Sequence, residues 1–344
     1  MAGAVDEWRI DSHKLIYHVE RVTAWLRGEN IYPLFAEIGL AGGCNHRCTF
    51  CALDFLAYKK SFQNEEKLLQ ALTQAAKGGL KAVMYCGEGE PLLHPRVAQI
   101  VKDTRALGLD VAITSNASLL SRELAREILP HLTFFRASIN AGTPQTYARV
   151  HRVRENEFSK VLHNLKQAVE FKGNCTVGAQ IVVLPENRDE VDILAARLAA
   201  IGLDYLIVKP YSQHPKSIVR MATEPLPEVH AQGIKIIMRY QAEENLRTEK
   251  SYRHCLALPF WSYIDARGNV WGCSCFLGDE RFYYGNINQE DFSEIWESDK
   301  RRKSLEWVEN DMPIEECRKA CRLDQINQYL WELKKAPPLH VNFI

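Results

Sequence analysis

The stretch LFAEIGLAGGCNHRCTFC, residues 34–51, joins a short apolar run to three cysteines. The apolar part has the composition of a β-strand, and Cys44, Cys48 and Cys51 follow it at spacings of four and three. A thiol-rich loop directly after a strand is typical of a loop that holds a metal centre. Two kinds of centre fit: a structural zinc, which needs a fourth ligand such as His46, and a four-iron cluster with three Cys ligands and one open iron.

Beyond this stretch, short apolar runs alternate with longer helical patterns. The alternation predicts βα units around a parallel sheet. Six expected strands are fewer than the eight of a closed barrel, so the predicted fold class is α/β with a partial (β/α)6 TIM-like barrel. The expected strands are residues 34–40, 82–86, 110–114, 133–139, 176–184 and 205–209, and the expected helices are residues 65–77, 95–107, 121–128, 157–171 and 188–200.

The two ends of the chain have a different character. The first thirty residues predict one amphipathic helix, and the pattern at 229–245 predicts another. A turn signal at 266–268 predicts a β-hairpin, and helical patterns follow at 292–307 and 315–333. We therefore expect an N-terminal helical extension at residues 1–32, a barrel at 33–250 and a small C-terminal domain at 251–344.

Composition and charge narrow the function. The 344 residues are 46% apolar and 25% charged, and 43 basic residues balance 43 acidic ones, so no global field attracts nucleic acid or an anionic membrane. No apolar run reaches the roughly 18 residues of a membrane span, and the N-terminus lacks a secretory signal pattern. We expect a cytoplasmic protein whose ten cysteines are metal or redox groups rather than disulfides. Cys86 and Cys175, inside apolar runs, fit buried small hydrophobes.

A second motif, GEGEP at residues 87–91, follows the second expected strand. Glycines at a strand end expose backbone groups to a ligand, and Glu90 adds a carboxylate. An ordinary strand-to-helix turn is the alternative interpretation. Asn116, Ser138 and Asn140 follow later strands, at the edge where parallel barrels hold their active sites, although local turn hydrogen bonds explain such residues equally well.

Together, the two motifs resemble those of the radical S-adenosylmethionine (SAM) enzymes. The resemblance implies that Cys44, Cys48 and Cys51 bind a [4Fe–4S] cluster and that the glycine-rich motif receives the methionyl ammonium group of SAM. Glu88 departs from the family pattern, in which glycine is commoner at this position. The expected cofactor-binding residues are Phe50, Gly87, Glu88, Gly89, Glu90, Pro91, Asn116, Ser138 and Asn140.

Five further cysteines lie in the last quarter of the chain, namely Cys255, Cys273, Cys275, Cys317 and Cys321. A structural zinc bound by four of them is one interpretation. A resemblance to the twitch and SPASM subgroups of radical SAM enzymes implies instead that Cys255, Cys273, Cys317 and Cys321 bind one auxiliary [4Fe–4S] cluster. Cys275 is then left over as an alternative ligand, an inert thiol or a hydrogen-atom donor.

The resemblance also implies a reaction. SAM would be cleaved to a 5′-deoxyadenosyl radical that takes hydrogen from a carbinol C–H of a sugar, nucleotide sugar or aminocyclitol, with electrons from a flavodoxin- or ferredoxin-type reductant. The leading hypothesis is epimerisation, in which Cys275 returns a hydrogen atom to the opposite face. In the second, Lys209 or His214 is the base of a dehydrogenase, and the remaining electron passes to the auxiliary cluster.

Two further hypotheses stay open. The first is the maturation of a ribosomal peptide, although the roughly forty residues before Cys44 are few for the winged-helix module that often captures such peptides. The second is a non-catalytic scaffold with two zinc ions. That scaffold leaves the motif at residues 87–91 unexplained.

Overall fold

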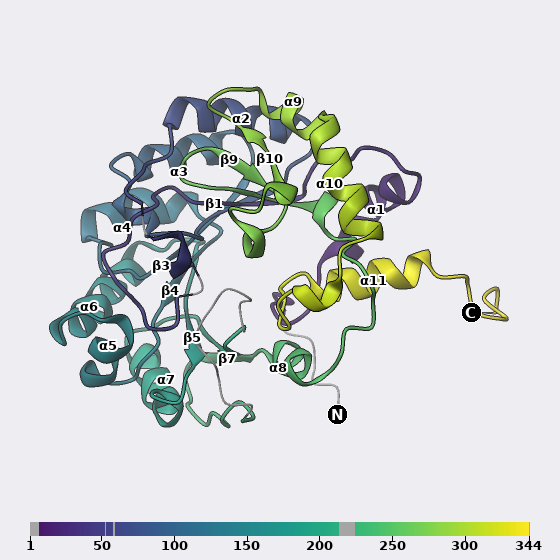
Figure 1. The fold of residues 1–344 in the computed structure, drawn as a ribbon. Helices are drawn as coiled ribbons and strands as arrows, with labels where there is room; N and C mark the ends of the chain where they lie inside the picture. The colour runs from purple at the N-terminus through teal and green to yellow at the C-terminus, as the bar shows by residue number, and fades with distance from the viewer. Residues whose placement is uncertain (1–6, 52, 58, 213–223, 344) are drawn as a thin grey trace.

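The computed structural model describes residues 7–51, 53–57, 59–212 and 224–343, and its centre is one ten-stranded sheet (Figure 1). The strand order is β10-β9-β8-β1-β2-β3-β4-β5-β6-β7, and every pair from β8 to β7 is parallel. The first seven strands are β1 Phe35–Ile38, β2 Ala82–Tyr85, β3 Asp110–Ser115, β4 Phe134–Ser138, β5 Thr176–Val183, β6 Tyr205–Pro210 and β7 Lys235–Met238.

Amphipathic helices cover the outer face of this sheet (Figure 1). In the first of them, Leu68, Leu72 and Ala75 form a buried stripe, and Asn64 accepts a hydrogen bond from the Lys67 N–H as the N-cap. The helices are α2 Glu65–Lys77, α3 Val97–Ala106, α4 Arg122–Ile128, α5 Pro144–His151, α6 Asn156–Phe171 and α7 Val191–Ala200. The expected partial barrel is confirmed.

The C-terminal region continues the same sheet instead of forming a separate one. Strand β8, Trp261–Ile264, pairs in parallel with β1, and β9, Asn269–Trp271, and β10, Tyr283–Asn286, extend it as an antiparallel hairpin and third strand. Helices α9 Phe292–Glu297, α10 Asp299–Asn310 and α11 Asp324–Lys334 follow. The expected hairpin is therefore present, and it is hydrogen-bonded to the barrel.

The expected helix at residues 229–245 is wrong in its first half. The structure has strand β7 there, paired with β6, followed by helix α8, Tyr240–Arg247. A four-residue run with two isoleucines is too short for periodicity to separate helix from strand. The free edge of β6 makes this run a strand, because pairing satisfies the backbone hydrogen-bonding groups of β6 and buries Ile237.

Three other expected helices are also shorter than predicted. The N-terminal one is reduced to a single turn, Leu15–Tyr17, and α1, Val19–Leu26. Trp8 instead packs on Tyr205, with ring centroids 5.1 Å apart. The helix expected at 292–307 breaks at Ser298, which caps α10, and the one expected at 315–333 begins only at Asp324.

The two ends of the parallel sheet do not pair with each other. Helix α8 beside β7 meets helix α11 of the C-terminal region, where Gln325 Nε2 donates to Gln241 Oε1 at 2.6 Å. His13 stacks on Tyr329 of the same helix, with ring centroids 4.7 Å apart. Helical packing therefore joins the two ends, as Figure 1 shows for α8 and α11. No helix of the described residues has the length and apolar character to cross a membrane.

We predict that Trp296 is a main support of the contact between the C-terminal helices and the barrel. Its side chain is fully buried, its Nε1–H donates to the Ile31 carbonyl at 2.8 Å, and its ring stacks on Phe292. Trp296→Ala should lower the free energy of unfolding by about 3–5 kcal/mol in urea titrations. Trp296→Phe keeps a ring and should lose about 1 kcal/mol, whereas equal losses for both variants would contradict the packing argument.

Candidate active site

One large cavity lies at the carboxyl ends of the barrel strands. It has a volume of about 460 Å³, and residues from β1 to β6 and from the C-terminal region line it. The predicted site residues among its lining are Cys44, Cys48, Phe50, Cys51, Gly87, Gly89, Glu90, Asn116, Ser138, Asn140 and Lys209. His214 lies outside the described residues.

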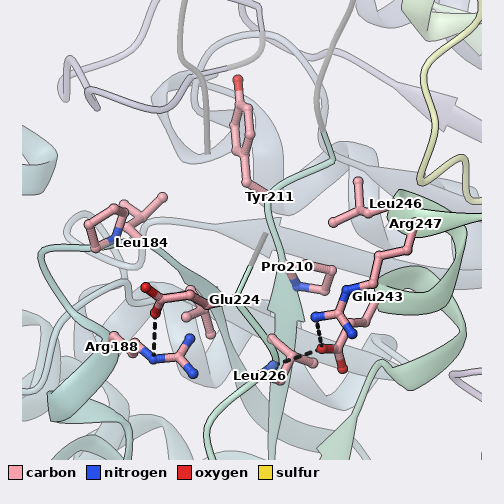
Figure 2. A pocket seen from close by; sticks show the side chains of 11 residues that line it. Leu184, Arg188, Pro210, Tyr211, Glu224, Leu226, Glu243, Leu246 and Arg247 are labelled. Atoms are coloured by element: carbon pink, nitrogen blue, oxygen red, sulfur yellow. Dashed lines mark hydrogen bonds and ion pairs between the residues drawn. The ribbon is translucent and has the colours of Figure 1, made fainter. Parts of the chain in front are cut away.

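A second, smaller pocket lies beside the end of β6 and contains none of the predicted site residues (Figure 2). Its charged groups already have partners: Arg188 pairs with Glu224 at 3.3 Å, and Glu243 pairs with Arg247 at 3.0 Å. Glu243 also accepts from the Leu226 N–H. The large cavity is therefore the candidate active site.

The three cysteines of the first motif line this cavity from the loop after β1. Four thiolates on one zinc would lie only about 3.8 Å apart, given Zn–S bonds of about 2.3 Å. Among the described residues, the one group of three possible ligands whose atoms all lie within 4.8 Å of one another is His46, Cys48 and His151, so the three cysteines of the motif are not all as close together as one zinc requires. The wider spacing suits a four-iron cluster.

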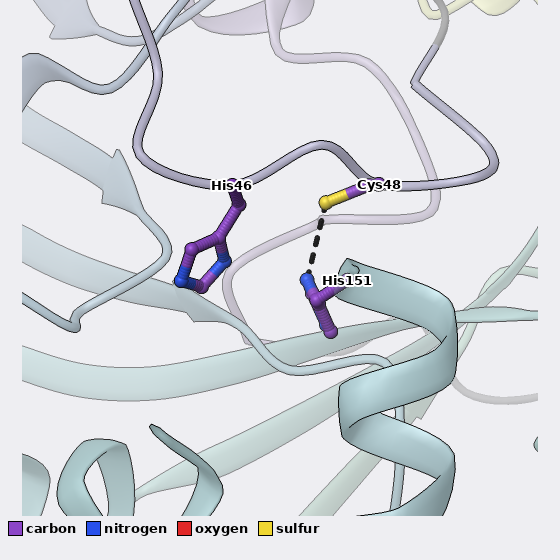
Figure 3. Close-up of side chains that lie close together, drawn as sticks. All are labelled: His46, Cys48 and His151. Carbon is purple, nitrogen blue, oxygen red and sulfur yellow. Dashed lines mark hydrogen bonds between the residues drawn. The ribbon is translucent and has the colours of Figure 1, made fainter. Parts of the chain in front are cut away.

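The side chains of Cys48 and His151 are in direct contact (Figure 3). The Cys48 Sγ lies 3.1 Å from His151 Nδ1, and the Asn140 backbone N–H points at His151 Nε2 at 3.2 Å. A backbone N–H can only donate, so Nε2 accepts and the ring proton must be on Nδ1. His151 therefore donates a hydrogen bond to the Cys48 sulfur, the kind of contact that tunes a metal–thiolate centre.

His46 behaves differently from His151. Its ring is 2% exposed, and neither ring nitrogen has a hydrogen-bond partner among the described residues. Burial lowers the pKa of His46 to about 4, so the ring is neutral at physiological pH. It meets the His151 ring edge-on at 5.5 Å. His46 thus packs against His151 and lines the cavity with the cysteine loop.

The glycine-rich motif touches the cysteine loop directly. Gly89 has φ +67°, and a Cβ at this position would collide with the carbonyl oxygens of Ala41 and Gly43. The Glu90 N–H donates to the Gly43 carbonyl at 2.8 Å. Only glycine at 89 allows the two loops to approach this closely, which brings the Glu90 region beside the thiols.

The carboxylate of Glu90 is buried and fully engaged. It accepts from Ser115 Oγ at 2.7 Å, from the Leu92 N–H at 3.0 Å and from the Asn116 N–H at 2.8 Å. Burial raises its pKa, and these three donors oppose that shift. Glu90 is therefore a preorganised acceptor at the cavity wall. Pro91 lies behind it, at the start of a 3₁₀ turn.

Glu88 points away from the cavity. Its Oε1 accepts from the Ala266 N–H in the β8–β9 turn at 2.8 Å, and its own N–H donates to the Tyr263 hydroxyl at 3.0 Å. Burial and the neighbouring Asp265 raise its pKa to about 7. The residue that departs from the family pattern therefore connects the barrel to the C-terminal region instead of lining the site.

Among the polar residues at later strand ends, Asn116 makes the local bond that turn chemistry predicts, whereas Ser138 and Asn140 bond across to β5. Asn116 Oδ1 accepts from the Ser118 N–H at 3.0 Å, and Asn140 Oδ1 accepts from the Val182 N–H at 2.7 Å. Ser138 Oγ accepts from Gln180 Nε2 at 2.9 Å. All three predicted residues still line the cavity, so positioning of the strand ends and cofactor contact are compatible roles.

The C-terminal cysteines lie together behind the cavity wall. The thiols of Cys273 and Cys275 are in hydrogen-bond contact with each other, and so are those of Cys317 and Cys321. Asn327 Nδ2 donates to Cys255 Sγ at 3.5 Å. These five thiols do not line the cavity, but neighbouring residues Ser274, Arg318, Ala320 and Arg322 do.

Comparison with known proteins agrees with this geometry. Residues 38–198 match the radical SAM superfamily, and residues 229–322 match SPASM, an iron–sulfur cluster-binding domain. The chain is a radical SAM protein with a SPASM domain. These domains imply SAM and iron–sulfur clusters as cofactors. The SPASM match begins at residue 229 and includes β7 and α8. It therefore starts before residue 251, where the expected C-terminal domain begins.

Similar proteins have diverse named activities. The chain is 23% identical over 296 residues to a tungsten-containing aldehyde ferredoxin oxidoreductase cofactor-modifying protein of Pyrococcus furiosus, covering 78% of this chain and 81% of the relative. It is 31% identical over 130 residues to an S-adenosylmethionine-dependent nucleotide dehydratase of Flammeovirga pacifica, covering 36% of this chain and less than half, 44%, of that relative.

Solved structures support the fold of this radical SAM protein. Streptococcus suis SuiB bound to its precursor peptide SuiA superposes with a TM-score of 0.65 at 16% identity, covering 93% of this chain and 77% of SuiB. The protein anSMEcpe with bound AdoMet superposes with a TM-score of 0.57 at 16% identity, covering 87% and 95% of the two chains. At this identity the likeness concerns the fold.

Several cavity residues were missing from the sequence prediction. Arg136 stands two residues before Ser138 on β4, so the two-residue period of a strand would have placed it on the same face. Cys86, interpreted as a buried hydrophobe, is 8% exposed and lines the cavity. His151 and Arg318 come from a helix end and a loop, and no local pattern in the sequence marks either.

We predict that His151 raises the reduction potential of the first cluster. His151→Phe removes the N–H donor to Cys48, so the more negative, reduced cluster loses stabilisation and its midpoint potential should become more negative. Redox titration of the loaded protein, followed by electron paramagnetic resonance, measures this shift. His46→Phe is the matched control, because the His46 ring bonds no thiol, and an equal shift in both variants would contradict the role of the hydrogen bond.

Proposed function

We propose that this radical SAM protein oxidises a secondary alcohol of a small substrate, such as a sugar, nucleotide sugar or aminocyclitol, to a ketone. The observation that carries the proposal is the position of Lys209, a basic side chain at the end of β6 that lines the cavity. Names of relatives that refer to nucleotides, such as the nucleotide dehydratase and GTP 3′,8-cyclase, agree with a nucleotide sugar.

The surroundings of Lys209 suit a general base. Its Nζ lies 2.9 Å from Gln180 Oε1, and no described carboxylate pairs with it. Burial lowers its pKa to about 7, helped by the positive charges of Arg136, Arg239 and Arg318, while Cys86 acts in the opposite direction. Near neutral pH, a large share of the amine is therefore unprotonated and able to accept a hydroxyl proton.

The chemistry divides between the cofactors and the chain. When bound, SAM on a cluster at Cys44, Cys48 and Cys51 would supply the hydrogen-abstracting radical, and an auxiliary cluster would supply the electron acceptor. The alcohol loses one hydrogen atom, one proton and one electron in becoming a ketone, and Lys209 takes the proton. A flavodoxin- or ferredoxin-type protein is the proposed reductant.

The position of Cys275 favours oxidation over epimerisation. Its side chain is 1% exposed and lies among the other C-terminal thiols instead of at the cavity. Epimerisation is the second candidate function, because the Cys86 thiol does line the cavity and can present a hydrogen atom to a substrate radical. A peptide is the alternative substrate, suggested by the precursor peptide in the SuiB structure.

We predict two separate iron–sulfur clusters. Protein reconstituted without oxygen should hold about eight irons per chain, since each [4Fe–4S] cluster contributes four. The double variant Cys44→Ala, Cys48→Ala should keep about half of this iron, because the C-terminal thiols form an independent ligand set. Metal analysis that finds two tightly bound zinc ions and almost no iron would favour the scaffold hypothesis instead.

We predict that ketone formation rises with pH through about 7 and then levels off, because Lys209 accepts protons only when it is neutral. Lys209→Met should remove this step and most of the ketone while 5′-deoxyadenosine still forms. Chromatography of both products at several pH values measures the effect. An unchanged pH profile in Lys209→Met would exclude Lys209 as the base.

The same experiment in heavy water separates oxidation from epimerisation. A thiol hydrogen exchanges with solvent, so an epimerase would introduce one deuterium at the inverted carbon, and Cys86→Ala would abolish that label. Oxidation introduces no deuterium at this carbon and is unaffected by a thiol donor. Mass spectrometry of the product therefore identifies which of the two reactions occurs.

A further inference from the structure

Arg136 is a cation in the cavity wall with no carboxylate partner among the described residues. Its Nε–H donates to the Tyr205 hydroxyl at 3.3 Å, and its guanidinium lies 4.7 Å from the centre of the Phe134 ring. These contacts hold the side chain on the inner face of β4, and no described carboxylate neutralises its charge. Arg136 is partly buried, and a guanidinium group in such a position is stabilised when an anion pairs with it.

Arg318 approaches the same cavity from the SPASM domain. It stands between Cys317 and Cys321; the residue is half-buried, and its buried Nε has no hydrogen-bond partner among the described residues. Its positive charge and that of Arg136 both act on Lys209. Arg136, Arg318 and Lys209 thus line one cavity, to which the barrel contributes Arg136 and Lys209 and the SPASM domain contributes Arg318.

The other charged residues of the cavity already have partners. Arg239 pairs with Asp11 at 2.8 Å, and Arg322 pairs with Glu37. Glu90 accepts its three hydrogen bonds from neutral donors of β3 and the adjacent turn. Among the described lining residues, five are basic, Arg136, Lys209, Arg239, Arg318 and Arg322, and two are acidic, Glu37 and Glu90.

This local excess of basic residues contrasts with the zero net charge of the whole chain. The whole sequence balances 43 basic and 43 acidic residues, so a cationic cavity is a property of the fold and not of the composition. The positive charge of Arg318 also interacts with the neighbouring C-terminal thiols. Arg136 belongs to no such group of thiols. Among the described residues, its charge acts on the Cys86 thiol, whose pKa it lowers against the larger rise caused by burial.

We propose that the substrate alcohol carries an anionic group, a phosphate or a carboxylate, which binds Arg136 and Arg318. Guanidinium groups pair with both anions through two parallel hydrogen bonds. Because both arginines and Lys209 line the same cavity, an anion held by the arginines keeps the attached alcohol in the cavity with that amine. This inference rests on the proposed function and names the class of its substrate.

The first test measures the binding of small anions, independently of turnover. Calorimetry of the cluster-loaded protein with SAM uses pyrophosphate as the phosphate probe and malonate as the carboxylate probe. At least one should bind, and Arg136→Gln should weaken it tenfold or more, while Arg136→Lys retains part of the affinity. The matched control is Arg105→Gln, which removes an arginine that pairs with Asp110 away from the cavity. Absence of binding by both anions, or equal affinity in Arg136→Gln, would overturn the proposal.

The second test separates this inference from the oxidation itself. Glucose 1-phosphate, glucuronic acid and glucose differ mainly in their anionic group, and each is assayed for 5′-deoxyadenosine and ketone. A preference for either anion supports the inference, and the preferred one identifies phosphate or carboxylate. Oxidation of neutral glucose that is unaffected by Arg136→Gln would refute the anion site and leave the oxidation standing. Anion binding without any ketone would refute the oxidation alone.

Discussion

The parallel pairing of β1 with β2 on one side and β8 on the other is the constraint on which the rest of the structure depends. Parallel strands end at the same edge, so this register brings three loops together: the cysteine loop, the glycine-rich loop and the β8–β9 turn. The bonds from Glu90 to Gly43 and from Ala266 to Glu88 hold these loops in contact. The radical SAM domain and the SPASM domain therefore share one cavity.

Buried charge gives this cavity its chemical character. Its carboxylates are paired or saturated with hydrogen bonds, as in Glu90, whereas Arg136 has no counterion among the described residues. Burial, aided by neighbouring positive charges, lowers the pKa of Lys209 and makes its amine easy to deprotonate. A proton acceptor and a guanidinium without a counterion among the described residues share this cavity, which suits an anionic alcohol, because the positive charges that help to lower the pKa of the amine also attract an anion.

The expected elements differ in how well local sequence could predict them. The helix at 65–77 carries its own cap and a clear apolar stripe, so its bounds agree with α2. Strand β7 has no such local signal, and only the free edge of β6 makes it a strand. The N-terminal residues follow the same logic, since Trp8 packs on Tyr205 instead of continuing a helix. Contacts that are distant in sequence override weak local preferences in both cases.

The sequence by itself determined the class of cofactor chemistry, the partial barrel and the residues Cys44, Cys48, Cys51 and Glu90 of the cavity wall, because short motifs and strand periodicity are local properties. Only the tertiary structure decided that Glu88 joins the domains, that Cys275 lies away from the cavity and that Arg136 faces it with no counterion in the described part of the chain. Burial and charge pairing depend on segments that are far apart along the chain, and folding alone brings those segments together.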